Sequence, residues 1–160
     1  MRIGIGYDIH RYQEGRPLIL GGVSFPGEMG LGGHSDADVL LHAVIDALLG
    51  AAALGDIGQH FPADDPSYTD ANSLQLLARA GQLASGTGFR VEGIDATIIA
   101  ERPVLTPHSR QMCRHIAQAL VIEITKVNVK ATTNEGIGAL GRGEGVAALA
   151  VVLLAKKDES

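Results

Sequence analysis

The sequence predicts an α/β (α+β) layer fold in a single domain. Segments with apolar residues at every second position alternate along the chain with longer segments of helical periodicity. Strands and helices that alternate at these lengths are typical of a sheet layered against helices. With 160 residues, 46% of them hydrophobic, the chain is long enough to bury one core.

The first third of the chain predicts two strands followed by a helix. Residues 1–10 carry apolar side chains at odd positions from Ile3 to Ile9, and a second strand is predicted at 17–23. A glycine-rich loop then leads into a helix at 36–54. Ser35 is its predicted N-cap because Asp38 follows three residues later, as in a capping box.

The middle of the chain continues the alternation. Two prolines and two glycines at 55–66 predict an irregular loop, and an amphipathic helix follows at 71–84. A strand is predicted at 89–100, a helix at 107–120 that begins on a proline, and a strand at 126–132.

The last predicted strand, residues 146–155, has almost no polar residue on either face. A sheet with helices on one face and water on the other would show polar residues at alternate positions. A second apolar surface is therefore predicted to cover this strand, and a neighbouring subunit would supply it most simply. The alternative is a central strand covered on both faces within one chain.

Composition excludes several classes of partner. The net charge of −5 and the lack of any Lys/Arg cluster argue against nucleic acid. No apolar run approaches the roughly 20 residues of a membrane helix, and the immediate strand pattern at the N-terminus predicts no signal peptide. The single cysteine, Cys113, fits a reducing, cytoplasmic setting.

Three side chains form a candidate metal site. Asp8 and His10 share one face of the first strand, and His42 lies in the first helix. Two histidines and a carboxylate are a set that Zn²⁺ uses in catalytic sites, although an Asp-x-His pair is also common at ordinary strand ends. Asp38 and Asp46 lie one helical turn on either side of His42, and Asp46 is the preferred acceptor for its second ring nitrogen. Alternatively, His42 belongs to the core and the aspartates face solvent.

Two further segments suit a phosphate. His34 and Ser35 precede the first helix, whose N-terminus favours anions, although Ser35 could simply cap it. In the glycine-rich stretch 133–145, Thr133 and the preceding Thr132 offer hydroxyls, Glu135 offers a ligand for a hard cation, and the glycines let backbone N–H groups approach an anion. Neither a Walker A nor a Rossmann motif is present.

Four motifs together resemble the 2-C-methyl-D-erythritol 2,4-cyclodiphosphate synthase family of the non-mevalonate isoprenoid pathway. They are DIH, HSDADVLLHAVIDALLGAAALGDIGQHFP, ATIIAERP and VKATTNEGIGALGRGEG, and the resemblance runs from Met1 to Lys157. It implies one synthase domain over residues 1–160. It also implies conversion of 4-diphosphocytidyl-2-C-methyl-D-erythritol 2-phosphate to the 2,4-cyclodiphosphate and CMP, in the cytoplasm of a bacterium or in a plastid-type pathway.

The resemblance further implies roles for individual residues. Asp8, His10 and His42 match zinc ligands, and Glu135 matches the ligand of a second divalent cation, Mg²⁺ or Mn²⁺. His34 and Thr133 match the residues that stabilise the transition state. The implied substrate contacts are Asp8, His10, His34, Ser35, Asp56, Ile57, Gly58, Phe61, Asp65, Ala100, Pro103, Val104, Leu105, Thr106, Thr132, Thr133, Asn134, Glu135 and Arg142.

The family implies a homotrimer whose mixed sheets pack around a threefold axis, with helices on the outer face and active sites between subunits. The cytidine and diphosphate pocket, 100–106 with Thr132, would come from a neighbouring subunit. A cavity on the axis near Arg142 can hold isoprenoid diphosphates in the family. Two residues depart from the pattern: Val104 replaces an expected lysine, and Ala139 replaces an aromatic residue beside that cavity.

Two rival functions remain for the same residues. One is a non-catalytic zinc-binding oligomer, and the other is a metal-dependent phosphohydrolase. The Thr-Thr-Asn-Glu sequence at 132–135, together with His34, favours the synthase because a structural zinc site would not need them.

Overall fold

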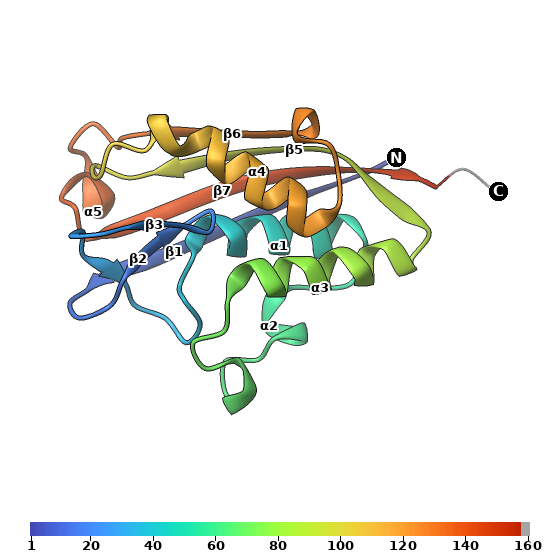
Figure 1. Cartoon of the computed structure of the whole chain (residues 1–160), viewed down its shortest axis with the longest axis horizontal. Helices are drawn as coiled ribbons and strands as arrows, with labels where there is room; N and C mark the ends of the chain where they lie inside the picture. Colours follow the sequence, from blue (N-terminus) through green and yellow to red (C-terminus); the bar gives the residue numbers. More distant parts are fainter. Residues whose placement is uncertain (158–160) are drawn as a thin grey trace.

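The computed structural model describes residues 1–157; residues 158–160, the end of the predicted domain, lie outside the described residues. The main sheet has the strand order β4-β1-β7-β5-β6 (Figure 1). Its strands are β1 (Arg2–Gln13), β4 (Gly30–Leu31), β5 (Phe89–Ile99), β6 (Val127–Thr132) and β7 (Gly145–Lys156). Because β7 is antiparallel to β1 and β5 whereas β6 is parallel to β5, the sheet is mixed, as predicted.

The three long helices lie against one face of this sheet (Figure 1). They are α1 (Val39–Ala51), α3 (Ser73–Gly86) and α4 (Ser109–Leu120). Helix α1 packs on β1 and β7, α4 packs on β6, and α3 packs against both of these helices. Two four-residue helices lie between the longer elements: α2 (Ile57–His60) in the loop that was predicted to be irregular, and α5 (Gly138–Gly141) in the glycine-rich stretch.

Two glycines let α1 lie directly on β1. A Cβ atom on Gly4 would overlap the carbonyl oxygen of Ala47, and one on Gly6 would overlap that of Ala43. No larger residue fits at these positions, so glycine sets the distance between the helix and the strand. The same close approach brings the side chain of His42 to Asp8 and His10 of β1.

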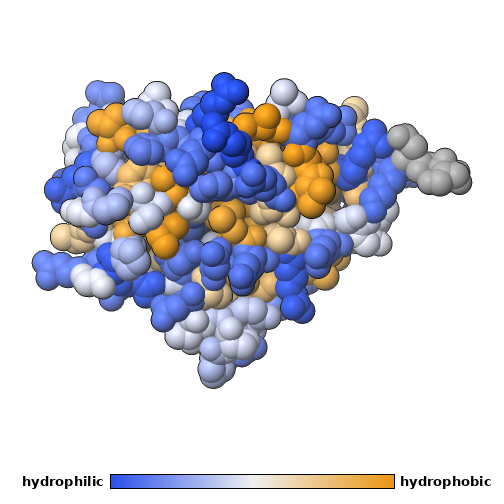
Figure 2. Space-filling view, in the orientation of Figure 1, coloured by the Kyte–Doolittle hydropathy of each residue, from blue (hydrophilic) through white to orange (hydrophobic). Residues whose placement is uncertain are grey.

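The opposite face of the sheet remains uncovered within residues 1–157. Leu149 and Val151 of β7 are 39% and 38% exposed, while Ile3 and Ile5 of β1 are 71% and 72% exposed. The interpretation of β7 as a strand covered on both faces within one chain is therefore wrong. We call the exposed residues Ile3, Ile5, Tyr7, Ile9, Leu149 and Val151 the open face. The side that carries α4 instead mixes polar and apolar side chains (Figure 2).

The predicted second strand at 17–23 is wrong. The segment forms a hairpin of two short strands, β2 (Leu18–Leu20) and β3 (Val23–Phe25). Gly21 and Gly22 between them have φ values of 58° and 71°. Two consecutive residues with positive φ make a tight hairpin turn, so the Gly-Gly pair reverses the chain inside an apolar run.

The predicted capping of the first helix is also wrong. Helix α1 begins at Val39, and its N-cap is Asp38 rather than Ser35. Ala37 lies in the left-handed region at φ 56°, so the helix cannot start before it. The Asp38 carboxylate is fully buried and accepts hydrogen bonds from the N–H groups of Leu41 and of both hairpin glycines. Burial raises the pKa of Asp38 to about 6.

The other predicted elements are found with shifted ends. The helix predicted from residue 107 begins as a 3-10 turn, Thr106–His108, before α4 starts at Ser109. Among residues 1–157, no helix combines the length and apolar composition needed to cross a bilayer.

Candidate metal and substrate site

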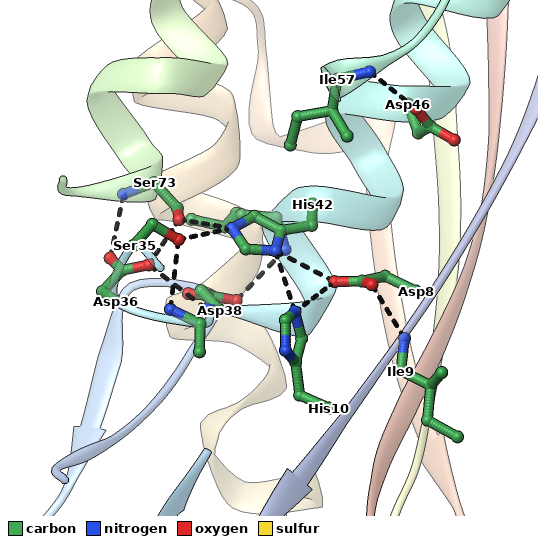
Figure 3. A network of polar contacts seen from close by, with 12 residues as sticks. Asp8, Ile9, His10, Ser35, Asp36, Asp38, His42, Asp46, Ile57 and Ser73 are labelled. Carbon is green, nitrogen blue, oxygen red and sulfur yellow. Dashed lines mark hydrogen bonds and ion pairs between the residues drawn. The ribbon is translucent and has the colours of Figure 1, made fainter. Parts of the chain in front are cut away.

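Asp8 and His10 of β1 converge with His42 of α1 (Figure 3). Asp8 Oδ2 lies 2.8 Å from His10 Nε2 and 3.0 Å from His42 Nδ1, and these two ring nitrogens are 3.3 Å apart. Side chains two residues apart on a strand share a face, which explains why Asp8 and His10 point together. The close packing of α1 on β1 supplies the third group.

The donor atoms fit a single zinc ion. Three atoms bonded tetrahedrally at the usual zinc distances of about 2.0–2.1 Å lie roughly 3.3 Å from one another. The observed separations of 2.8 to 3.3 Å therefore suit a shared ion. The side chains of Asp8, His10 and His42 are 26%, 18% and 12% exposed, so a fourth ligand could reach the ion from solvent.

The tautomer of His10 follows from its surroundings. Its Nδ1 lies 2.6 Å from the carbonyl oxygen of Gly32, which can only accept a hydrogen bond. Nδ1 therefore carries a proton, and in the neutral ring Nε2 offers its lone pair toward Asp8. Burial alone would lower the pKa of His10, but the neighbouring Asp8 carboxylate raises it overall. Burial alone would raise the pKa of Asp8, but the hydrogen bonds and positive charge that His10 and His42 supply when protonated hold it far below its usual value.

Asp46 is not the partner of His42, contrary to the prediction. Its Oδ1 accepts the N–H of Ile57 at 3.0 Å and so holds the start of α2 (Figure 3). The Asp38 carboxylate accepts instead from the N–H groups of Gly21, Gly22 and Leu41. His42 Nε2 instead lies 3.0 Å from Ser35 Oγ and 3.0 Å from Ser73 Oγ.

Sequence reasoning overlooked Ser73 and Asp36. Ser73 is the first residue of α3, far from His42 in the chain, and its hydroxyl donates to Asp36 Oδ1. A sequence pattern indicates that a serine can begin a helix but not what it faces. The signal for Asp36 was present in the His-Ser-Asp-Ala-Asp run, where it precedes the buried Asp38 by two residues.

Arg16 was also not predicted to belong to the site. Its guanidinium donates to the carbonyl oxygens of Gly33 and Ser35 and thereby holds the segment that carries His34. Arg16 lies close enough to His10 to oppose the rise in its pKa.

A pocket of about 250 Å³ opens beside the three ligands. We call it the metal-side pocket. It gathers residues of β1, α1, α2 and the loop before α1, several of them apolar. It is lined by Tyr7, Asp8, His10, His34, Ser35, His42, Asp46, Ile57, Gly58, Phe61, Ala63, Tyr68 and Leu76.

Two predicted contacts, Asp56 and Asp65, are not in the lining of this pocket. Asp56 caps α2 through the N–H of Gln59, and Asp65 caps the next turn through the N–H of Ser67. That N–H lowers the pKa of Asp65. Asp65 also positions His34, whose Nε2 donates to its carbonyl oxygen at 3.2 Å.

Most of the remaining predicted contacts line a second pocket of about 260 Å³. We call it the loop-side pocket. It lies where the loops after β5 and β6 meet, and it shares no lining residue with the metal-side pocket. It is lined by Ala100, Glu101, Pro103, Val104, Leu105, Thr106, Ala131, Thr132 and Thr133.

A carboxylate fixes the loop that carries Thr133 and Glu135. Glu101 Oε1 accepts the N–H groups of Asn134 at 2.8 Å and Gly136 at 3.4 Å. The Thr133 hydroxyl lies 3.2 Å from Glu135 Oε1. The prediction that these backbone N–H groups serve an external anion is therefore wrong for this pair, because Glu101 already occupies them.

Three predicted residues, Asn134, Glu135 and Arg142, line neither pocket. Arg142 follows α5 and pairs with Glu144 at 2.7 Å between Nε and Oε1. Ala139 lies within α5 and is exposed.

The chain matches the model of the YgbB family over residues 1–155. A protein of Clostridium perfringens named 2-C-methyl-D-erythritol 2,4-cyclodiphosphate synthase is 56% identical over 156 residues, which cover 98% of this chain and 100% of that one. A protein of Geobacter sulfurreducens with the same name is 58% identical over 157 residues, again 98% and 100% of the two chains.

Solved structures agree with these relatives. The bifunctional IspDF of Campylobacter jejuni superposes with a TM-score of 0.94 at 43% identity; the match covers 98% of this chain but spans only 42% of the bifunctional one. IspF of Plasmodium falciparum, solved as a complex with CDP, has a TM-score of 0.86 at 31% identity, and the match covers 98% and 97% of the two chains.

Proposed function

Because this chain belongs to the YgbB family and its curated relatives are named cyclodiphosphate synthases, we propose that it converts 4-diphosphocytidyl-2-C-methyl-D-erythritol 2-phosphate to 2-C-methyl-D-erythritol 2,4-cyclodiphosphate and CMP. Residues 1–160 would form one synthase domain acting in the cytoplasm. The single observation that carries this proposal is the convergence of Asp8, His10 and His42 beside a pocket lined by His34 and Ser35.

Asp8, His10 and His42 would hold Zn²⁺, and Glu135 would hold a second cation, Mg²⁺ or Mn²⁺. Such cations neutralise phosphate charge and orient the reacting groups when they are bound. The donor set supports zinc because the carboxylate and both imidazoles present lone pairs to one point. A single exposed carboxylate such as Glu135 supports a cation that also takes ligands from the substrate phosphates.

The reaction needs little acid–base chemistry from the protein. An oxygen of the 2-phosphate attacks the β-phosphorus, and the bond from that phosphorus to the bridging oxygen breaks. CMP leaves with the bridging oxygen and its electron pair. Because a phosphate monoester is largely dianionic at neutral pH, no base is required to activate it. The protein must instead hold both anionic groups in line.

His34 and Thr133 would donate hydrogen bonds to the transferring phosphoryl group. In the structure His34 Nε2 donates to the Asp65 carbonyl oxygen, and this hydrogen bond would have to be exchanged for one to the phosphate. The Thr133 hydroxyl would turn from Glu135 toward the phosphate.

Each of the two pockets would bind a different part of the substrate. The metal-side pocket, with caps Asp56 and Asp65 near its rim, would bind the methylerythritol phosphate. The loop-side pocket would bind the cytidyl diphosphate, with Val104 in the position of the lysine that the family pattern carries. Asn134 and Arg142 would contact the substrate from outside the linings of the two pockets. An isoprenoid diphosphate would bind in the axial cavity near Ala139.

A homotrimer would join the metal-side pocket of one subunit to the loop-side pocket of the next. Two observations support this arrangement. The pockets are separate within one chain, and six apolar or aromatic side chains of β1 and β7 are exposed together on the open face. The helices would then face outward, because they cover the other side of the sheet.

The decisive experiment is incubation of the purified protein with the diphosphocytidyl substrate, with Zn²⁺ and Mg²⁺ present, followed by analysis of the products. The proposal predicts equal amounts of CMP and cyclic diphosphate, and loss of both after chelation. A non-catalytic zinc-binding oligomer would leave the substrate intact. A phosphohydrolase would release inorganic phosphate or linear products, and either outcome would refute the synthase.

A further inference from the structure

Ser73 lies between the imidazole of His42 and the carboxylate of Asp36 (Figure 3). Its Oγ is 3.0 Å from His42 Nε2 and donates to Asp36 Oδ1. We propose that Ser73 and Asp36 are positioning residues that fix the tautomer of His42, so that its Nδ1 lone pair faces Asp8 and His10. This inference rests on the proposed zinc site but not on the synthase reaction.

The donors in the hydrogen bonds that link Asp36, Ser73 and His42 can be assigned because Ser73 Oγ carries a single hydrogen. An ionised carboxylate only accepts. Asp36 accepts the backbone N–H of Ser73 at 2.9 Å through Oδ2 and that of Asp38 at 3.2 Å through Oδ1. The only hydrogen available between Ser73 Oγ and Asp36 Oδ1 is therefore the hydroxyl hydrogen of Ser73. Ser73 has no second hydrogen, so it can meet His42 Nε2 only as an acceptor. His42 Nε2 must then carry the proton.

Ser35 cannot set the tautomer by itself. Its Oγ also lies 3.0 Å from His42 Nε2 and accepts the N–H of Ala37 at 3.3 Å. The hydroxyl hydrogen of Ser35 is not committed to a carboxylate, so this residue could donate to Nε2 or accept from it. Ser73 differs because its hydroxyl hydrogen is already donated in the hydrogen bond to Asp36.

The position of Ser73 is rigid. It is fully buried at the first residue of α3, and the same Asp36 carboxylate holds both its backbone and its side chain. The backbone N–H of Asp36 in turn donates to Ala71. The tautomer of His10 is fixed by one carbonyl oxygen, that of Gly32. The tautomer of His42 is fixed by the Ser73 hydroxyl, which the Asp36 carboxylate orients. Metal-binding histidines are commonly oriented by a carboxylate or carbonyl in this way.

The test is the zinc dissociation constant of the intact, folded oligomer, measured by competition with a chromogenic chelator. Ser73→Ala should weaken zinc binding by about 10- to 100-fold, the usual cost of removing a residue that orients a ligand. Asp36→Asn should weaken it too, because the amide cannot accept at both oxygen positions. Ser73→Thr keeps the hydroxyl and should restore most of the affinity.

Two matched controls separate this role from general damage. Asp95→Asn removes the charge of an exposed aspartate that does not line the metal-side pocket and should leave zinc affinity unchanged. Ser35→Ala should cost clearly less than Ser73→Ala. Wild-type zinc affinity in Ser73→Ala, or an equal loss in Ser35→Ala, would overturn the assignment.

A spectroscopic measurement keeps the inference testable if Ser73 variants fail to fold. In the zinc-loaded wild-type protein with ¹⁵N-labelled histidine, two-bond ¹⁵N–¹H spectra should show His42 metal-bound through Nδ1 and protonated at Nε2. Coordination through Nε2 would refute the inference. Tight zinc binding of this type without any cyclic product would instead refute the proposed reaction and leave this inference standing.

Discussion

The metal-side and loop-side pockets differ in how their polar groups are held. In the metal-side pocket, Asp8, His10 and His42 project from a long strand and a long helix and are mostly buried. In the loop-side pocket, Thr133 and the nearby Glu135 lie on an exposed loop. One half of the proposed site is thus set by the packing of the domain, whereas the other is set by local hydrogen bonds.

Each half nevertheless depends on one carboxylate that holds other residues of the site in place. Asp36 acts on the metal side through Ser73, and Glu101 acts on the loop side through two backbone N–H groups. The comparison predicts that loss of a metal ligand abolishes function, whereas loss of a residue that only holds the loop, such as Glu101, reduces it by degrees.

The largest effect is expected from His42→Ala. Loss of one of three protein ligands should abolish zinc binding and lower kcat/KM by about a thousandfold or more, because metal ions supply several kcal/mol of transition-state stabilisation. Zinc content by atomic absorption and turnover by CMP release would measure this. Stoichiometric zinc with full turnover in the variant would rule out the ligand assignment.

A smaller effect is expected from Glu101→Ala. Two loop N–H groups, one part-buried and one exposed, lose their acceptor, which loosens the loop that carries Thr133; a loss of about 1.4 kcal/mol in the alignment of that loop would lower kcat roughly tenfold. Zinc content should not change, since Glu101 belongs to the other pocket.

Glu101→Gln is the matched control for that variant. The amide oxygen can still accept both N–H groups, so this variant should keep kcat within about twofold of the wild type. If the glutamine variant is as impaired as the alanine variant, the charge of Glu101 matters and the hydrogen-bond explanation fails.

The division between two pockets also predicts complementation between inactive variants. His42→Ala and Thr133→Ala damage opposite halves, so unfolding them together and reassembling them should restore activity. In a cyclic trimer with random mixing, roughly a quarter of the interfaces would pair two intact halves. Activity near that fraction of wild type is expected in mixtures that native mass spectrometry shows to contain both chains. Mixed trimers without activity would place the whole site within one chain.

Much of the fold could be predicted because most elements follow a clear period. The strand at the N-terminus, the helix at 71–84 and the closing strand all appear near their predicted positions. The hairpin at Gly21 and Gly22 could not be read from hydrophobicity, since the turn interrupts an apolar run without any polar residue. The start of α1 was misplaced because capping patterns do not reveal the left-handed Ala37.

The candidate site was predictable where its residues lie on one element and unpredictable where two elements meet. Asp8 and His10 follow from strand alternation alone. Helical spacing correctly puts Asp46 one turn from His42, but it does not say which way the imidazole turns. That direction depends on Ser73, which α3 brings from another part of the chain. Tertiary packing of this kind has no local sequence signal.

The smallest effect should come from Val104→Lys, which tests whether the loop side can be improved. Val104 is 78% exposed in the loop-side pocket, so a lysine there needs no repacking. An exposed charge pair contributes at most about 1 kcal/mol, and KM should fall by roughly two- to fivefold with kcat unchanged. Val121→Lys adds the same charge at a position that is 91% exposed and outside both pockets, and it should leave KM unchanged. Because salt screens exposed charges, the gain at residue 104 should shrink as ionic strength rises. An equal gain from both variants would mean that net charge attracts the substrate and that the loop-side pocket does not bind its diphosphate.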